Sequence, residues 1–507
     1  MKRWLAIGLS ALMIFSLTAC GGSQKNPDII SSSGVLELHN SSEPEEESSS
    51  SELPDSMDDP VLPGSSSTAP SSVPVINSSS AATSKPSVSS SSAASSKPPA
   101  SSSSAASSKP SSSSSAPQSS SSSSKSSSSY KPNTNPSKTP SDEMRGVWIS
   151  YLDFNTLLKN KSRAEFNKNI NFAFAKIEAA GFNTVFVQVR PFGDALYESH
   201  YFPWSHTITG TEGEDPGFDP LALMIEAARD NDLRIEAWIN PYRIRNSGTK
   251  AALSDNNLAQ AWLEEGTGEV IEYDGGLYYN PGNEFARKLI VDGVTEILEN
   301  YNVDGIHFDD YFYPTTDADF DADTYAQYKA DGGKLSLANW RRENVNILVR
   351  EVYAEIKRHD KYIEFGISPQ GNNENNYNTQ YIDVEEWVTN KGYVDYICPQ
   401  IYFGFENENY PFAETVQEWD DMIRLNSVDL YIGMAPYKLG AQDSWAGSGK
   451  NEWLNTTNLL QRMVVEARRY DHYQGFAMFR YDSLFNPASN VKSQVETEKK
   501  NLKSILD

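Results

Sequence analysis

The sequence predicts an α/β fold, a (β/α)8 TIM barrel preceded by a disordered serine-rich linker. Two observations support this prediction. Over residues 142–507, eight short runs rich in β-branched and aromatic residues alternate with amphipathic helical patterns, as in a chain of βα units that closes into a barrel. The preceding residues are dominated by serine and carry too little apolar surface to offset the entropy of ordering them.

Each run is expected to be a parallel strand, because most runs are apolar on both faces and would be covered by helices. The strand-like runs are 144–150, 184–190, 233–240, 305–311, 363–369, 394–402, 430–436 and 475–481. The helical patterns are 164–180, 219–230, 283–301, 335–359, 383–390, 413–425, 452–470 and 489–506. Asp219 and Pro220 suit the start of the second helix, and Gly181 suits the end of the first. A doubly wound open sheet is the alternative, but residues 149–152 lack its glycine-rich phosphate turn.

Residues 1–20 are predicted to be a lipoprotein signal peptide. Residues 1–3 carry positive charge, and residues 4–17 form an apolar stretch too short for a stable membrane span. The stretch ends in Leu-Thr-Ala-Cys at 17–20, as in a bacterial lipobox, so we expect Cys20 to be lipidated and to anchor the protein to the membrane. An ordinary secretory signal with an accidental cysteine is the alternative. Both interpretations predict a location outside the cytoplasm, and the lipidated cysteine predicts the extracellular face of the bacterial envelope, with the protein anchored to the membrane.

Residues 21–141 are predicted to be a disordered Ser/Pro-rich tether between the anchor and the barrel. The unit Ser-Ser-Ala-Ala-Ser-Ser-Lys-Pro occurs at 91–98 and again at 103–110. A flexible coil of about 110 residues has a root-mean-square span of roughly 55–60 Å. Such a tether would let the barrel sample a shell of cell-wall material above the membrane.

Composition and motifs exclude several classes of function. The formal net charge of −25 argues against nucleic acid as a partner. The two cysteines, Cys20 and Cys398, make no disulfide framework, and Cys398 suits a small buried apolar residue. The six histidines form no HxH or HExxH motif, and no Gly-x-Ser-x-Gly motif occurs. We therefore expect no metal site, no cofactor and no serine-hydrolase triad.

The residues that end the predicted strands are polar and aromatic, and parallel barrels place their active sites at this end. Asp309 and Asp310 end the fourth run, and alternation puts His307 and Asp309 on the same face of the strand. Amide and charged groups can hydrogen-bond sugar hydroxyls, and aromatic rings can stack on pyranose faces. The substrate-binding candidates are Gln188, Arg190, Trp238, Asn240, Tyr242, Arg243, His307, Tyr311, Gln370, Gln400 and Tyr402. A helix cap or a solvated turn is the alternative for the aspartate pair, and core packing is the alternative for any single ring.

Five ordered motifs, at 144–148, 182–190, 237–243, 304–313 and 399–402, resemble those of the bacterial glycosyl-hydrolase-like family 10 lipoproteins. The resemblance implies a TIM-barrel glycoside hydrolase of the cell envelope, with peptidoglycan glycan strands as the polysaccharide substrate. The family's strand-four signature falls on Asp309 and Asp310. Glu236 stands where members often have a histidine, so a role for this position is less well supported by the resemblance.

Glycoside hydrolysis normally uses one ionised and one protonated carboxyl group, and the catalytic candidates are Asp309, Asp310 and Glu236. We expect Asp309 to be the ionised partner, with a pKa lowered by Arg190 or Arg243. The proton donor stays open among the acidic residues near the predicted mouth: Asp310, Glu236, Glu374, Asp194 and Asp482. The predicted function is hydrolysis of envelope glycan strands. A non-catalytic surface glycan-binding lipoprotein with a barrel fold and a structural envelope protein are the alternatives.

Overall fold

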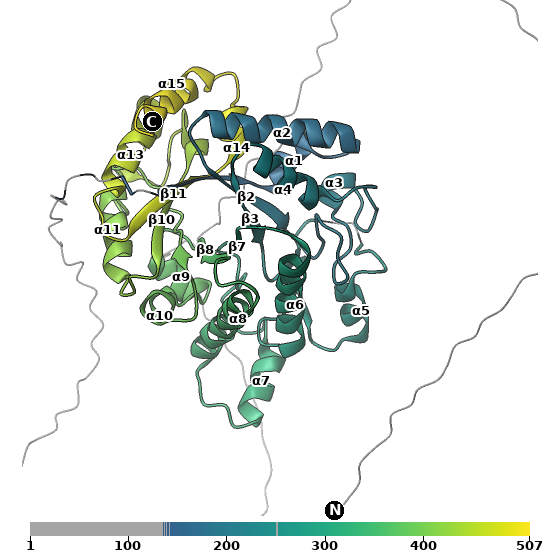
Figure 1. The fold of residues 1–507 in the computed structure, drawn as a ribbon. Coiled ribbons are helices and arrows are strands. Elements are labelled where there is room, and N and C mark those ends of the chain that lie inside the picture. The colour runs from purple at the N-terminus through teal and green to yellow at the C-terminus, as the bar shows by residue number, and fades with distance from the viewer. Residues whose placement is uncertain (1–134, 136, 138, 141, 250–251, 507) are drawn as a thin grey trace, which may run out of the picture. The chain divides into compact units, whose positions relative to one another are not determined.

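The computed structural model describes residues 135, 137, 139–140, 142–249 and 252–506. The predicted signal peptide, Cys20 and nearly all of the predicted linker lie outside the described residues. Eight parallel strands form a closed barrel that is surrounded by helices, which confirms the predicted TIM barrel (Figure 1). Within the described part of the chain, no helix is both long and apolar enough to cross a membrane.

The barrel strands follow each other around the closed sheet in the order β1-β11-β10-β9-β8-β7-β3-β2. Their bounds are β1 Met144–Ile149, β2 Thr184–Arg190, β3 Arg234–Ile239, β7 Gly305–Phe308, β8 Glu364–Ile367, β9 Tyr396–Ile397, β10 Asp429–Met434 and β11 Tyr473–Met478. The first and last strands pair in parallel, with Met144 opposite Gly475, and so close the ring. All eight predicted strands are therefore present.

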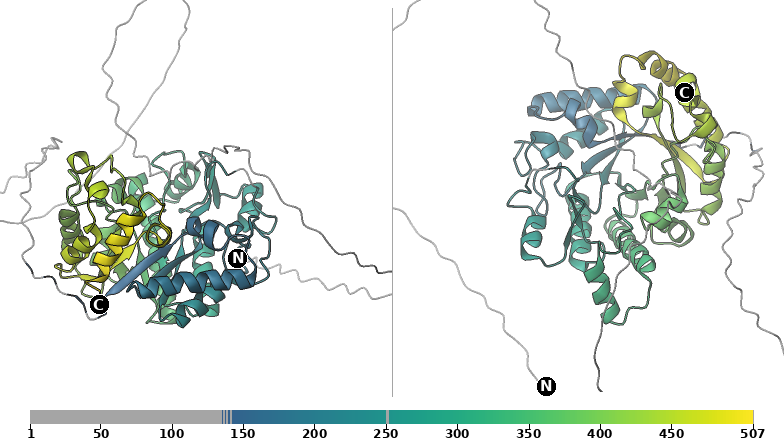
Figure 2. Two further views of the ribbon diagram at one scale, coloured as in Figure 1. Left: turned by 90° about the horizontal axis from the view of Figure 1, so that it is seen from above. Right: turned by 180° about the vertical axis from the view of Figure 1, so that it is seen from behind.

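One main helix follows each barrel strand and packs on the outside of the sheet, as the view from behind also shows (Figure 2). These helices are α2 Arg163–Ala179, α4 Pro220–Asp230, α6 Glu284–Asn300, α8 Leu337–His359, α10 Val384–Thr389, α11 Phe412–Met422, α13 Leu459–Ala467 and α15 Lys492–Lys503. Shorter helices lie in the connections: α1 Tyr151–Leu157, α3 His206–Thr209, α5 Leu258–Glu265, α7 Ala322–Ala330, α9 Asn373–Thr379, α12 Glu452–Asn455 and α14 Tyr481–Phe485.

Local sequence signals set several helix ends as expected. The Asp219 side chain accepts a hydrogen bond from the backbone N–H of Ala222, and Pro220 occupies the first position of α4. Gly181 follows the last residues of α2 with a φ of 94°, a left-handed conformation that glycine adopts without a steric penalty. Both predicted boundaries are confirmed.

The structure differs from the sequence prediction in three places. The predicted strand at 394–402 is regular only over β9, because Pro399 has no N–H to continue the ladder. The predicted helix at 452–470 is two helices, α12 and α13. A small antiparallel sheet was not predicted; its strands are β4 Arg243–Arg245, β5 Val270–Tyr273 and β6 Gly276–Tyr279.

The small sheet does have a sequence signal. Asp274-Gly275 joins β5 to β6, and both residues have positive φ, 46° and 74°, as an Asp-Gly hairpin turn requires. The hairpin lies in the connection between β3 and α6. Strand β6 of this hairpin pairs with β4, which follows the carboxyl end of β3.

The buried carboxylate of Glu143 links the first and last strands of the barrel at the amino ends of these strands. Glu143 accepts hydrogen bonds from Arg468 at 2.7 Å, from the Tyr473 hydroxyl at 2.8 Å and from Arg145 at 2.9 Å. Burial raises the pKa of Glu143, but the hydrogen bonds and charge of Arg468 outweigh burial, and the net pKa is lowered. Glu143 is therefore ionised, and its hydrogen bonds join the start of β1 to the end of α13 and to β11.

We predict that Glu143→Gln destabilises the barrel, because it leaves the buried Arg468 without its anionic partner. Removing one partner of a buried ion pair typically costs about 3–5 kcal/mol, to be measured as the free energy of unfolding in urea. Glu165→Gln is the matched control, since Glu165 is exposed and bonds only Ser162. Equal stability of the two variants would contradict the stabilising role of the Glu143 carboxylate.

Candidate active site

Two adjacent carboxylates follow β7 at the carboxyl end of the barrel, which we call the mouth. Asp309 and Asp310 are only 3% and 6% exposed. Asp309 Oδ2 accepts a hydrogen bond from the Trp238 indole N–H at 3.2 Å, and its Oδ1 accepts one from the Tyr311 N–H at 3.1 Å. A neighbouring strand, β3, thus helps to fix this carboxyl group.

Burial and the neighbouring charge of Asp310 raise the pKa of Asp309 to about 7. Arg243 and the hydrogen bonds of Asp309 act in the opposite direction but are weaker than desolvation. The prediction that Asp309 has a lowered pKa is therefore wrong. A negative charge on one of these two desolvated carboxyl groups disfavours ionisation of the other, so their pKa values depend on each other.

Asp310 is held by amide groups from the next two strands. The Gln400 side-chain N–H donates to Asp310 Oδ1 and to the Ser368 carbonyl, both at 3.0 Å. Burial raises the pKa of Asp310, while hydrogen bonds from Gln400 and Gln370 lower it. Gln400 and Gln370 are also paired through an isolated bridge, so the two predicted amides lie beside the acidic pair.

Arg243 lies beside the pair as a largely buried cation. It is 8% exposed, its Nε donates to the Pro191 carbonyl at 3.0 Å, and no ion pair joins it to a carboxylate of the described residues. Its guanidinium lies over the Tyr311 ring at 4.7 Å and the Phe192 ring at 4.9 Å. Tyr311 is itself 48% exposed. This edge of the mouth thus presents a cation and an accessible aromatic ring.

Other predicted binding residues complete the mouth. Gln188 donates to Asn240 Oδ1 at 2.7 Å and accepts from the Tyr151 N–H at 2.9 Å, so both amides are fixed. The Trp238 and Tyr402 rings both contact Phe479, with ring centroids 6.5 Å and 6.0 Å from it. Phe479 follows β11 and was not among the predicted site residues.

Arg190 does not face the mouth, contrary to the prediction. The β2–β3 register shifts between Gln188 and Arg190, so Arg190 pairs with Ile239 instead of continuing the inward alternation. A slip of one residue turns a side chain to the other face of the sheet. Arg190 is 1% exposed and lies over the Phe202 ring at 4.4 Å, outside the barrel.

Tyr242 also points away from the mouth. It is buried in the core between sheet and helices, where its ring contacts Phe312 at 6.2 Å. Desolvation raises the pKa of Tyr242, and Arg287 and Glu351 on α6 and α8 are its nearest charges. The position of Tyr242 therefore does not agree with the prediction that this residue binds substrate at the mouth.

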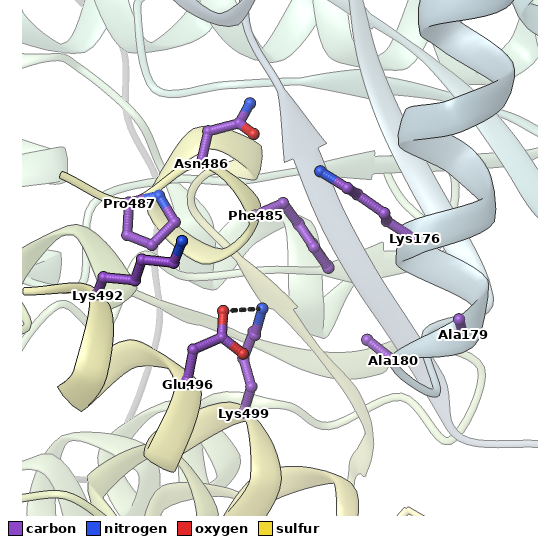
Figure 3. A pocket seen from close by; sticks show the side chains of 9 residues that line it. All are labelled: Lys176, Ala179, Ala180, Phe485, Asn486, Pro487, Lys492, Glu496 and Lys499. Atoms are coloured by element: carbon purple, nitrogen blue, oxygen red, sulfur yellow. Dashed lines mark hydrogen bonds and ion pairs between the residues drawn. The ribbon is translucent and has the colours of Figure 1, made fainter. Parts of the chain in front are cut away.

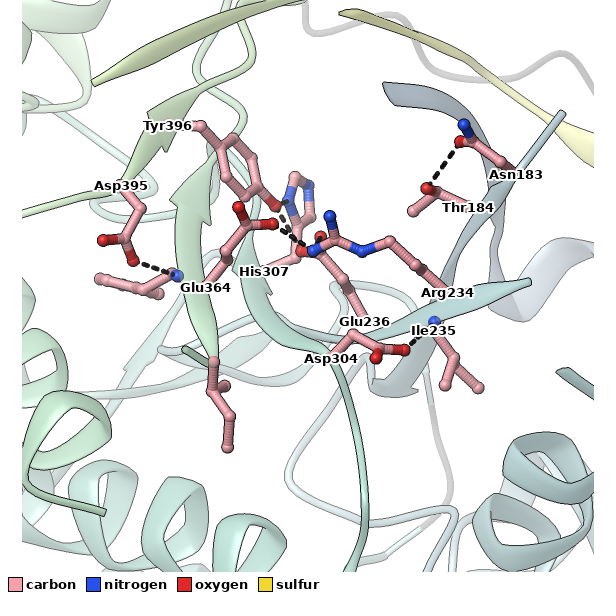
Figure 4. Close-up of polar contacts among 12 residues, drawn as sticks. Asn183, Thr184, Arg234, Ile235, Glu236, Asp304, His307, Glu364, Asp395 and Tyr396 are labelled. Atoms are coloured by element: carbon pink, nitrogen blue, oxygen red, sulfur yellow. Dashed lines mark hydrogen bonds and ion pairs between the residues drawn. The ribbon is translucent and has the colours of Figure 1, made fainter. Parts of the chain in front are cut away.

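Glu236 and His307 lie deeper, inside the barrel. Both are fully buried, and each is two residues before a mouth residue on the same face of its strand, Trp238 and Asp309 respectively. Glu236 accepts a hydrogen bond from the Tyr396 hydroxyl at 2.6 Å (Figure 4). Glu236 therefore does not lie at the mouth, and His307 lies beneath Asp309.

Two of the remaining acidic candidates, Asp194 and Asp482, have other partners. Asp194 bonds the His206 ring at 2.6 Å, and Asp482 lies with Arg480 and Asp153 at the ends of β11 and β1. Asp153 was not predicted as a site residue. The sequence signal that could have drawn attention to it is the capping-box pattern Ser150-x-x-Asp153 at the start of α1. Burial raises the pKa of Asp153 to about 6, against the opposing charge of Arg480.

A separate hollow of about 600 Å³ lies on the outer surface between α2 and α15 (Figure 3). Lys176, Lys492 and Lys499 line it, and Lys499 pairs with Glu496 at 3.0 Å. None of the predicted site residues lines this hollow. Among the residues described, no group of three or more His, Cys, Asp or Glu side chains is arranged to hold a metal ion.

A closed parallel barrel with a desolvated pair of carboxyl groups at its mouth, surrounded by amides and aromatic rings, defines the class of barrel glycoside hydrolases. Comparison with known proteins identifies the family. Residues 143–447 match the model of the family described as glycosyl hydrolase-like 10. The chain therefore belongs to the glycosyl hydrolase-like 10 family and is a glycoside hydrolase.

Two curated relatives are similar over most of the barrel. The glycosyl hydrolase YngK of Bacillus subtilis is 33% identical over 380 residues, covering 70% of this chain and 71% of the relative. The glycosyl hydrolase DigH of Escherichia coli is 33% identical over 383 residues, covering 68% of this chain and 85% of the relative. Among solved structures, the PgaB glycoside hydrolase domain from Bordetella bronchiseptica aligns with a TM-score of 0.44 at 12% identity, covering 70% of this chain and 99% of that one.

We predict that Asp309→Asn makes stability less dependent on pH. A carboxyl whose folded pKa is raised stabilises the fold below its unfolded pKa and loses this contribution as pH rises through about 7. The shift from 3.8 to about 7 corresponds to at most about 4 kcal/mol. Between pH 4 and pH 9 the variant should therefore gain stability relative to wild type, measured by urea unfolding. Asp317→Asn, in the exposed part of the same loop, should track wild type; a parallel pH dependence for Asp309→Asn would contradict the burial effect.

Proposed function

We propose that this protein hydrolyses the glycosidic bonds of cell-envelope glycan strands, with peptidoglycan as the substrate. The observation that carries the proposal is the acidic pair at the mouth, two adjacent buried carboxyl groups whose pKa values are both raised by desolvation, which lets the pair hold a proton at a pH where an exposed aspartate is ionised. Hydrolysis of a glycosidic bond needs such a proton on the leaving oxygen and a negative charge near the developing oxocarbenium ion.

In this proposal Asp309 is the proton donor and Asp310 is the ionised partner. Burial of Asp309 and the neighbouring charge of Asp310 favour its protonated form, and the opposing effects of Arg243 and of the Trp238 indole N–H are weaker. Asp310 accepts a hydrogen bond from the Gln400 amide, which favours the ionised form. The assignment reverses the role first expected for Asp309, because burial of this side chain outweighs the charge of Arg243.

The surrounding groups suit a polysaccharide. Tyr311 offers an exposed ring for a sugar face, and the guanidinium of Arg243, which no ion pair joins to a carboxylate of the described residues, can donate to hydroxyl or carboxylate oxygens. Gln188, Gln370 and Gln400 supply amides at fixed positions. These groups support a neutral or acidic sugar chain as the ligand.

The proposed location is the extracellular face of the bacterial envelope, through a lipid on Cys20. The lipobox order at 17–20 supports this location, and the serine-rich stretch at 21–141 would be the tether.

We predict that Asp309→Asn and Asp310→Asn each lower the release of reducing ends from glycan strands by about 10²–10⁴-fold, the usual contribution of general acid catalysis. The substrate would be purified peptidoglycan glycan freed of stem peptides, with chitin oligosaccharides as a second glycan. Asp317→Asn is the matched control, because Asp317 is exposed in the same loop. Wild-type activity in folded Asp309→Asn would overturn the assignment.

The pH profile tests which residue donates the proton. If Asp309 must be protonated, activity should fall as pH rises through about 7, because its raised pKa sets the alkaline limb. The measurement is kcat/KM for reducing-end release between pH 4 and pH 9. An activity that keeps rising above pH 8 would contradict a protonated Asp309.

A further inference from the structure

The barrel interior contains a continuous chain of hydrogen bonds beneath the mouth. The Trp148 indole Nε1 lies 3.1 Å from His307 Nε2, and His307 Nδ1 lies 2.8 Å from the Tyr396 hydroxyl. The Tyr396 hydroxyl then lies 2.6 Å from Glu236 Oε2 (Figure 4). The four residues come from β1, β7, β9 and β3, so the chain joins four different strands.

The chemistry of the Trp148 end fixes the direction of the chain as far as Tyr396. An indole nitrogen can only donate, so His307 Nε2 must accept and carry no proton. His307 Nδ1 then carries the proton and donates to Tyr396, whose hydroxyl donates to the oxygen of Glu236. Burial lowers the pKa of His307 to about 3, which agrees with a neutral ring.

The surrounding strands leave room for these side chains and hold them closely. A Cβ atom at Gly305 would lie 2.7 Å from Glu236 Cδ, and one at Gly366 would lie 2.0 Å from Tyr396 Cε2. Any larger residue at either position would displace a member of the chain. The chain is therefore a packed part of the core, with little freedom to rearrange.

Two routes connect the chain to the acidic pair. His307 lies two residues before Asp309 on the same face of β7, and its ring contacts the Trp238 ring edge-on at 6.4 Å. Trp148 contacts Phe479 at 6.2 Å, and Phe479 in turn contacts Trp238. Both routes end at the indole N–H that Asp309 Oδ2 accepts.

We propose that Tyr396, His307 and Glu236 are positioning residues, which hold the His307 ring in its Nδ1–H form and thereby fix Trp238 and the carboxyl group of Asp309. The role in catalysis rests on the proposed function, whereas the hydrogen-bond chain itself does not. The inference also gives Glu236 and His307 a function that does not require them to touch substrate.

The first test needs no substrate. In protein labelled with ¹⁵N-histidine, the long-range ¹H–¹⁵N spectrum should show His307 as the neutral Nδ1–H tautomer, unchanged between pH 5 and pH 8. His307→Gln identifies the signal. An Nε2–H tautomer, or titration within this range, would overturn the direction of the chain.

The second test removes the central hydroxyl. Tyr396→Phe leaves the His307 Nδ1–H without its acceptor, so it should shift the His307 ring signals and the Trp238 indole N–H signal. It should also lower kcat about 10–100-fold with KM within about twofold, because a small displacement of a catalytic group has effects of this size. Tyr431→Phe is the matched control, since Tyr431 lies in the same interior, 4.6 Å from the Tyr396 ring, and no hydrogen bond joins it to the chain. Equal effects of the two variants, or no shift at Trp238, would overturn the proposal.

The third test separates positioning from direct catalysis by Glu236. Glu236→Gln keeps an oxygen that can accept from Tyr396 but cannot exchange a proton, so activity and tautomer should be close to wild type. Glu236→Leu should behave like Tyr396→Phe. Loss of activity in Glu236→Gln with an unchanged His307 tautomer would overturn the positioning role. If wild type released no reducing ends from any glycan, the proposed function would be wrong. The His307 and Trp238 signals would still show whether the hydrogen-bond chain exists and whether it positions Trp238.

Discussion

The structure depends on how the barrel fills its own interior. A closed ring of parallel strands has to pack its centre without water, and here that centre holds an indole, an imidazole, a phenol and a carboxyl group. A buried polar group without a partner costs about 1–3 kcal/mol, so these four groups are tolerable only because each bonds the next. Gly305 and Gly366 are also required for this packing, because the absence of a Cβ atom leaves the volume that Glu236 and Tyr396 occupy.

The same dry interior determines the chemistry at the mouth. Asp309 is placed directly above the hydrogen-bond chain, where desolvation is stronger than the attraction of Arg243. Its pKa therefore rises, and it can hold a proton at a pH where an exposed aspartate is ionised. Asp310, one residue further along, meets the amides of the next strands instead. Both carboxyl groups are desolvated but have different hydrogen-bond partners, and under the proposed function this difference suits them to the two roles that glycoside hydrolysis requires.

Much of the site followed from one rule, that parallel barrels carry their functional residues at the carboxyl ends of the strands. This rule placed Asp309, Asp310, Trp238, Gln400 and Tyr311 together, as the structure has them. It gave no information on depth within the barrel, and so it grouped residues of the interior with those of the mouth. It also missed the ring of the residue after β11, because a single phenylalanine after a strand has no pattern that distinguishes it from the core.

The sequence by itself determined the number of βα units, the helix ends marked by Asp219-Pro220 and Gly181, and the acidic pair at the end of the fourth strand. These features are local, because they depend on periodicity and on the backbone preferences of a few consecutive residues. Only the tertiary structure decided that Arg190 faces outward and that Asp309 has a raised pKa. The first depends on a register shift against β3, and the second on how many neighbouring strands exclude water. Both are set by residues distant in sequence, which no local pattern contains.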